Sequence, residues 1–207
     1  MRRRARKLNP VYPVCYVRPV TAPVKLPAPT LLTVEQWRAV LKRLSAEIGG
    51  APCEIGVVGG VAIALSHSAR RTTHDLDAIL DDATSRRVLD AAEQIAHEFA
   101  LPPMWLNNKA QQAGFVVGQA LGDVVYDDGH LVVRAASTEQ LLAMKVTAWR
   151  DQVDIDDAVL LLTRLAIDDL EEVWNRIGRD VPPKARSHAR ENLEEAWEIW
   201  AAYDEPS

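Results

Sequence analysis

Two short segments of this sequence combine residue types that can bind phosphate groups and metal ions. Gly59 and Gly60 follow a short apolar run, and Asp75 and Asp77 come after the next apolar segment. A glycine pair that opens a helix brings backbone N–H groups close to a phosphate, whose negative charge the helix N-terminus favours. Carboxylates two residues apart on a strand face the same way and can share a divalent cation. The pattern therefore predicts metal-assisted chemistry on phosphates.

Each half of this pattern also has a purely structural interpretation. Asp75 and Asp77 can lie on a solvated edge strand, and a glycine pair can allow a helix to pack closely on a strand. We expect Leu76 and Ala78 to face the core, because successive side chains of a strand alternate. Two carboxylates on one face repel each other unless a cation lies between them. Oxygen ligands suit Mg²⁺, with Mn²⁺ as the alternative ion, and the two segments together favour a metal site.

A lysine and two aspartates in the second half of the chain extend the pattern. Lys145 lies in a predicted helix over residues 137–150, with apolar residues three and four positions away. Its ammonium group must either snorkel to the surface or point into a site. Asp154 is expected to begin the next helix, where it can serve as the N-cap. Asp157 in the first turn would favour the helix dipole.

The rest of the sequence predicts a mixed fold that positions these residues. Thr33 and Ser137 each begin a capping box, which marks the start of a helix. The Asp127–Gly129 segment predicts a hairpin turn. The predicted strands cover residues 54–58, 75–80, 115–117, 123–126 and 131–133, and the predicted helices cover residues 33–48, 59–65, 83–99, 137–150, 154–162, 168–178 and 184–203. We therefore expect an α+β fold: a βαβ-like opening, a small mixed sheet flanked by helices, and a helical C-terminal third.

Composition divides the chain into three parts and limits its setting. Residues 1–30 contain basic residues, no acidic residue and six of the 12 prolines, which predicts a flexible tail. This tail is either a basic arm for nucleic-acid phosphates or an unstructured extension. Residues 31–136 form the predicted α/β core, and residues 137–207 form a helical part packed on it. The sequence contains no apolar run of about 18 residues, so we expect no membrane span. Two cysteines without metal spacing suit a reducing cytoplasm.

The order of these residues resembles the nucleotidyltransferase superfamily, and within it the AbiEii-like, toxin-type nucleotidyltransferases of bacterial toxin–antitoxin systems. The family pattern is a glycine pair, a helix, and then Arg-x-Thr-x-Asp-aliphatic-Asp. His74 lies inside this pattern, and we expect it to have a structural role. The resemblance extends over about residues 55–165. The matching residues are Gly59, Gly60, Arg71, Thr73, Asp75, Leu76 and Asp77.

The resemblance implies an enzyme that transfers a nucleoside monophosphate from ATP or another NTP to an acceptor hydroxyl. The acceptor would be a tRNA 3′ end, another RNA or a protein, and the chain would be the toxin partner of a cognate antitoxin. Asp75 and Asp77 would bind the metal, and the catalytic set would add Lys145, Asp154 and Asp157. The residues implied to contact the nucleotide phosphates are Gly59, Gly60, Arg71, Thr73 and Lys145.

Two details of the resemblance leave alternatives open. The family's Arg-Asp-x-x-Asp segment fits Arg150–Asp154 literally, whereas Val153–Asp157 fits the following leucines better but lacks the arginine. Many members also carry a third carboxylate on a later strand, and residues 131–133 offer none, while Asp123 and Asp127 are expected beside turns. Either Asp154 or Asp157 takes its place, or the chain is an inactive nucleotide-binding or protein-interaction member of this fold. Residues 105–108 also resemble a family segment, to which we assign no role.

Overall fold

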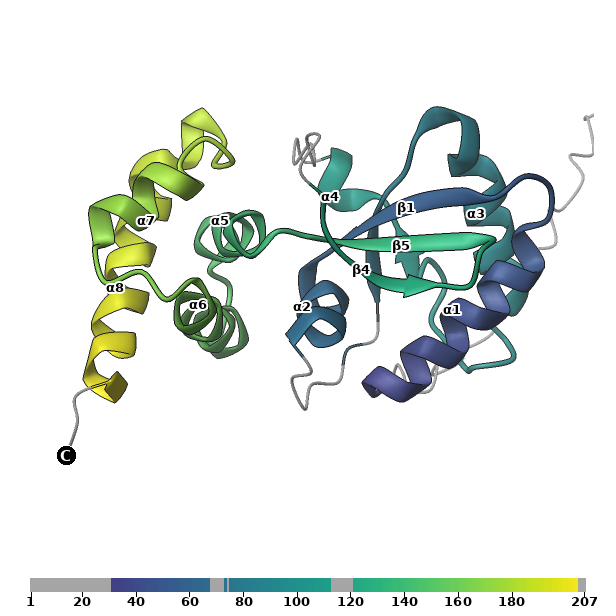
Figure 1. The fold of residues 1–207 in the computed structure, drawn as a ribbon, viewed down its shortest axis with the longest axis horizontal. Coiled ribbons are helices and arrows are strands. Elements are labelled where there is room, and N and C mark those ends of the chain that lie inside the picture. The colour runs from purple at the N-terminus through teal and green to yellow at the C-terminus, as the bar shows by residue number, and fades with distance from the viewer. Residues whose placement is uncertain (1–30, 68–72, 74, 113–120, 205–207) are drawn as a thin grey trace, which may run out of the picture.

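In the computed structural model, which describes residues 31–67, 73, 75–112 and 121–204, a five-stranded mixed sheet forms the centre of the part of the chain before α5 (Thr138–Ala148) (Figure 1). The strand order is β3-β2-β1-β5-β4. The central strand β1 runs parallel to β5 and antiparallel to β2. At the two edges, β3 runs parallel to β2, and β4 runs antiparallel to β5. The strands are β1 (Cys53–Val58), β2 (Leu76–Ile79), β3 (Leu106–Asn107), β4 (Leu121–Asp127) and β5 (Leu131–Ala136).

Among the described residues, four helices accompany the sheet. They are α1 (Val34–Ile48), α2 (Gly59–His67), α3 (Asp82–Ile95) and the short α4 (Lys109–Gln112). Helices α1 and α3 pack side by side, and the ring of Trp37 lies 5.8 Å from that of Trp105. The Trp105 indole also donates to the Ala92 carbonyl of α3 at 2.9 Å. These contacts fix the segment that leads into β3.

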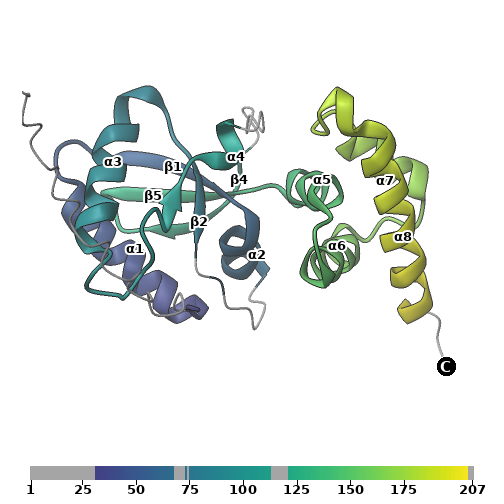
Figure 2. The same cartoon turned by 180° about the vertical axis from the view of Figure 1, so that it is seen from behind.

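The helical part of the chain begins directly after β5 and lies beside α2 (Figure 2). It contains α5 (Thr138–Ala148), α6 (Gln152–Leu165), α7 (Leu170–Ile177), a 3₁₀ turn (Pro183–Ala185) and α8 (Arg186–Asp204). Helix α5 packs on α6 and α8, and one continuous cluster of buried apolar side chains runs from α1 to α8. None of the helices in the described part of the chain is long and apolar enough to span a membrane.

The predicted α+β class and small mixed sheet are confirmed, and so are both capping boxes, at Thr33 and Ser137. The βαβ-like opening needs correction, because β1 and β2 are antiparallel. Helix α3 ends at Ile95, before the predicted end at residue 99. The predicted strand 115–117 and the tail 1–30 lie outside the described residues.

Two expectations about acidic residues are wrong. Asp123 lies within β4 and not beside a turn, because the strand begins earlier than its β-branched residues indicate. Asp154 does not begin a helix: α6 begins at Gln152, and Asp151 is its N-cap. The carboxylate of Asp151 accepts hydrogen bonds from the N–H groups of Val153 and Asp154, at 3.1 and 3.3 Å. Asp154 is therefore available for a different contact.

Candidate functional site

The glycine pair lies where β1 passes directly into α2, against the predicted metal ligands. Gly59 has a φ of +69°, and a Cβ atom at this position would lie 3.0 Å from Oδ2 of Asp77. A Cβ atom on Gly60 would lie 3.3 Å from Oγ1 of Thr73. Since larger residues would crowd these polar side chains, the glycines let the backbone at the start of α2 approach the acidic residues closely.

The two aspartates lie at the start of β2, on the side opposite to the core. Asp75 directly precedes the strand, and Asp77 pairs with Val58, the last residue of β1. Leu76 and Ala78 are fully buried, as the alternation predicts. The Thr73 hydroxyl donates to Oδ1 of Asp75 at 3.4 Å.

The environment of Asp77 is suited to a cation. Burial raises the pKa of Asp77, and the negative charge of Asp75 raises it further. Asn107, Lys109 and Arg150 act in the opposite direction without cancelling the effect. Two close carboxylates, one of them largely desolvated, are stabilised by a positive charge between them.

Lys145 is buried and does not snorkel to the surface. Its Nζ lies 2.6 Å from Oδ1 of Asp154 and 2.8 Å from Oδ2 of Asp157. The two aspartates are three residues apart on α6 and therefore share the helix face that meets α5. The structure thus brings together three of the residues expected to be catalytic, as an ion-pair cluster between two helices.

Arg150 connects this cluster to the cleft beside the acidic pair. Its backbone N–H and its Nε both donate to Oδ2 of Asp154, at 3.0 and 2.9 Å, and its Nη2 donates to Oδ1 at 3.2 Å. Burial raises the pKa of Asp154, but the hydrogen bonds from Arg150 and Lys145 outweigh it and hold the pKa well below its usual range. The Arg150 side chain is 71% exposed. The literal register of the Arg-Asp-x-x-Asp segment is therefore the one in which arginine and aspartate make contact.

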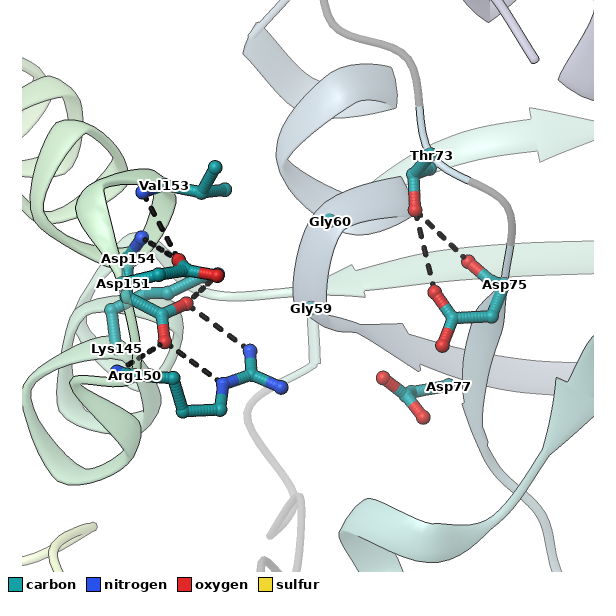
Figure 3. A pocket seen from close by; sticks show the side chains of 10 residues that line it. All are labelled: Gly59, Gly60, Thr73, Asp75, Asp77, Lys145, Arg150, Asp151, Val153 and Asp154. Carbon is teal, nitrogen blue, oxygen red and sulfur yellow. Dashed lines mark hydrogen bonds and ion pairs between the residues drawn. The ribbon is translucent and has the colours of Figure 1, made fainter. Parts of the chain in front are cut away.

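All of these elements meet around one cavity of about 400 Å³ (Figure 3). The sheet side supplies the glycine pair and the acidic residues, and the helical side supplies the two cations and the beginning of α6. In Figure 3 the Arg150 guanidinium lies between the helical side and Asp77. The lining residues are Gly59, Gly60, Thr73, Asp75, Asp77, Lys145, Arg150, Asp151, Val153 and Asp154.

A second cavity of about 350 Å³ adjoins the first. Both cavities are lined by Gly59, the two acidic residues of β2, Lys145 and Arg150, so the acidic pair lies at their boundary. The second cavity has a more apolar lining on the helical side. The residues found only there are Lys109, Ala110, Met144 and Ala148.

The sequence pattern missed part of this site. The sequence pattern included Arg150 only as the first residue of one register of the Arg-Asp-x-x-Asp segment. It assigned no role to Lys109 or to Asn107, although Asn107 lies within residues 105–108, which resemble a family segment. Arg71 and His74 lie outside the described residues.

The donor set of the acidic pair fits Mg²⁺ or Mn²⁺ but is small. Asp75 and Asp77 offer hard carboxylate oxygens, and these ions bind through one or two carboxylates with the remaining positions filled by water and substrate phosphates. In the described part of the chain, no group of three or more His, Cys, Asp or Glu side chains is placed to hold a metal ion. Water molecules and phosphate oxygens of a substrate would therefore fill the remaining coordination positions.

Comparisons of the chain with models of protein families, with curated proteins and with solved structures each returned no match. The function of this site is therefore inferred from its own residues and geometry.

Proposed function

We propose that this chain is a Mg²⁺-dependent nucleotidyltransferase, which transfers a nucleoside monophosphate from an NTP to an acceptor hydroxyl and releases pyrophosphate. The observation that carries the proposal is the cavity in which the Gly59–Gly60 backbone and the Asp75–Asp77 pair lie opposite Arg150. Backbone N–H groups and a guanidinium can bind the phosphates of a nucleoside triphosphate, and the carboxylates around the same cavity can bind its cation.

Each group of residues has a role in this reaction. The N–H groups at the start of α2 and the Arg150 guanidinium bind phosphate oxygens, and Asp75 and Asp77 hold the cation. When bound, Mg²⁺ polarises the α-phosphate and stabilises the charge that develops there. The acceptor oxygen forms a bond to the α-phosphorus while the bond to the bridging oxygen breaks, and the hydroxyl proton is released to solvent. Arg150 stabilises negative charge as it moves to pyrophosphate.

The acceptor and the biological setting are proposed from the sequence resemblance. We propose a tRNA 3′ end, another RNA or a protein as acceptor, and a cytoplasmic toxin with a cognate antitoxin as the setting. Lys145 is assigned here to positioning, because it is paired with Asp154 and Asp157.

Labelling with radioactive nucleotides tests the proposal. The protein is incubated with each α-³²P-labelled NTP, Mg²⁺ and total RNA or total protein, and label in macromolecules is measured. We expect label with the natural protein and none with Asp75→Asn or Asp77→Asn. Asp123→Asn, an exposed aspartate on β4 outside the cavity, is the matched control and should label normally. If the folded protein labels no acceptor, or if Asp77→Asn labels as well as the natural protein, the proposal is wrong.

A second candidate is a nucleotide-binding protein without catalysis. The observation that favours it is the small carboxylate set, since the described residues show no cluster of three metal-binding groups. It predicts that an NTP with Mg²⁺ raises the melting temperature while no acceptor becomes labelled.

A further inference from the structure

The shortest strand of the sheet places an asparagine directly beside a predicted metal ligand. Strand β3 runs parallel to β2, and Asn107 is in register with Asp77. Side chains of registered residues on neighbouring strands point to the same face of the sheet. The Asn107 side chain therefore lies on the face that carries Asp77, and it is almost completely buried, at 2% exposure.

One half of the Asn107 amide has a clear structural role. Its Oδ1 accepts a hydrogen bond from the backbone N–H of Lys109 at 3.0 Å, which closes the turn between β3 and α4. Since only the amide oxygen can accept a hydrogen bond, this contact fixes which end of the amide is which. The NH₂ group is thereby directed elsewhere.

The other half has no such partner. Nδ2 of Asn107 is buried without a hydrogen bond among the residues that the structure describes. Buried polar groups are nearly always paired, so an orphan of this kind needs an explanation. Because Asn107 and Asp77 are registered neighbours on adjacent strands, the amide lies beside the Asp77 carboxylate. Because the terminal torsions of Asn and Asp are broad, a rotation of either side chain can complete a hydrogen bond between them.

We propose that Asn107 is a positioning residue for the metal ligand Asp77. Its NH₂ group donates to one carboxylate oxygen of Asp77, so that the other oxygen faces the cation beside Asp75. The inference rests on the proposed function only in that Asp77 binds a divalent cation. A carboxylate held by an outer hydrogen bond loses less freedom when the cation binds, and loss of such a partner commonly weakens metal affinity about 10- to 100-fold.

Binding of Mn²⁺ alone, measured by the free-ion EPR signal, tests this role without any need for activity. Asn107→Ser keeps a short hydroxyl for the Lys109 N–H but cannot reach Asp77. Asn107→Leu keeps the branched shape of the side chain and removes both polar groups. We expect both variants to weaken Mn²⁺ binding about 10- to 100-fold, and we expect Asp77→Asn to abolish it.

Gln111→Ala is the matched control. Gln111 is also an amide that ties α4 to β2, through two hydrogen bonds with the backbone of Leu80 at 3.3 and 3.0 Å. These bonds lie at the end of β2 away from Asp77, so the variant should lower the melting temperature but leave Mn²⁺ affinity unchanged.

The outcomes separate this inference from the proposed function. If the natural protein binds Mn²⁺ through Asp77 and the folded Asn107 variants bind it equally well, the inference alone is wrong. If Gln111→Ala weakens binding as much as the Asn107 variants do, general loosening of β2 explains the effect and the inference is also wrong. If the natural protein binds no Mn²⁺, both the inference and the proposed metal site fail. Mn²⁺ binding that depends on Asn107, with no nucleotide transfer, would support the inference and overturn only the catalytic proposal.

Discussion

Lys145 and Asp154 form a buried ion pair, in which Nζ lies 2.6 Å from Oδ1 and the two side chains are 8% and 1% exposed. Asp157 shares the same ammonium group, and Arg150 shares Asp154. Two cations and two carboxylates therefore form a cluster whose formal charges balance. Lys145, Arg150 and Asp154 all line the cavity, and Arg150 is the most exposed of them, with 71% of its side chain exposed. The helical part thus presents its positive charge to the acidic pair through Arg150 more than through Lys145.

We expect Lys145→Met to destabilise the fold strongly. The substitution keeps much of the volume but leaves Asp154 and Asp157 buried without their shared cation. Removing one partner of a buried ion pair commonly costs about 3–5 kcal/mol. Urea denaturation should therefore show a marked fall in the free energy of unfolding.

Arg176→Met is the control for Lys145→Met. Arg176 forms an i,i+4 pair with Glu172 on α7 at 2.6 Å, with about half of each side chain exposed. Exposed pairs of this kind contribute little to stability. Equal stability losses in the two variants would contradict a structural role for Lys145. An unchanged stability in Lys145→Met would favour instead the role that the family resemblance implies, contact with the nucleotide phosphates.

We expect Arg150→Gln to weaken nucleotide binding more than it weakens the fold. A hydrogen bond to a charged group contributes about 1.5–3 kcal/mol, which corresponds to a roughly 10- to 150-fold loss of affinity for an NTP with Mg²⁺. Isothermal titration calorimetry measures the affinity directly. Arg164→Gln changes an exposed arginine in the last turn of α6 and should leave the affinity unchanged. An unchanged affinity in Arg150→Gln would remove this residue from the site.

The local features of the site could be predicted from sequence because they depend on residues close together in the chain, such as the alternation of side chains along a strand. The alternation along β2 placed Asp75 and Asp77 on one face and buried Leu76 and Ala78 behind them. The position of Gly59 beside this strand likewise followed from two adjacent segments of the chain.

The partners within the site could not be predicted because they depend on tertiary contacts. The direction of β2 relative to β1 is set by long-range pairing, which the helical connection leaves open. Strand β3 has only two residues, which are too few to give a periodic pattern. The sequence therefore could not predict that Asn107 lies beside Asp77. The burial of Lys145 depends on how α6 packs against α5.

We expect the hairpin between β4 and β5 to lose stability in acid through Asp128. Burial raises the pKa of Asp128, but hydrogen bonds from the Leu131 N–H, the Tyr126 and Ser45 hydroxyls and the His130 N–H outweigh it, and they hold the pKa well below its usual range. A carboxylate with a depressed folded-state pKa stabilises the fold above its unfolded pKa of about 4. This stabilisation is lost as the pH falls through the folded-state value.

Urea denaturation of the natural protein and of Asp128→Asn at about pH 7 and about pH 3 measures this contribution. The natural protein should lose more stability between the two pH values than the variant does, because the variant has no carboxylate to protonate at this position. Equal losses would show that Asp128 does not contribute to the acid sensitivity of the fold.

We expect Gly59→Ala to impair Mn²⁺ binding through direct contact with the acidic pair. The new Cβ atom would lie 3.0 Å from Oδ2 of Asp77, so the carboxylate would have to move. Gly129→Ala separates this effect from backbone strain. Gly129 also has a positive φ, +85°, but a Cβ atom there would meet nothing within 4 Å. Both variants should lose about 1–2 kcal/mol of stability from the left-handed backbone. Only Gly59→Ala should bind Mn²⁺ more weakly. Equal Mn²⁺ affinities in the two variants would contradict the predicted effect of a Cβ atom at Gly59 on the metal site.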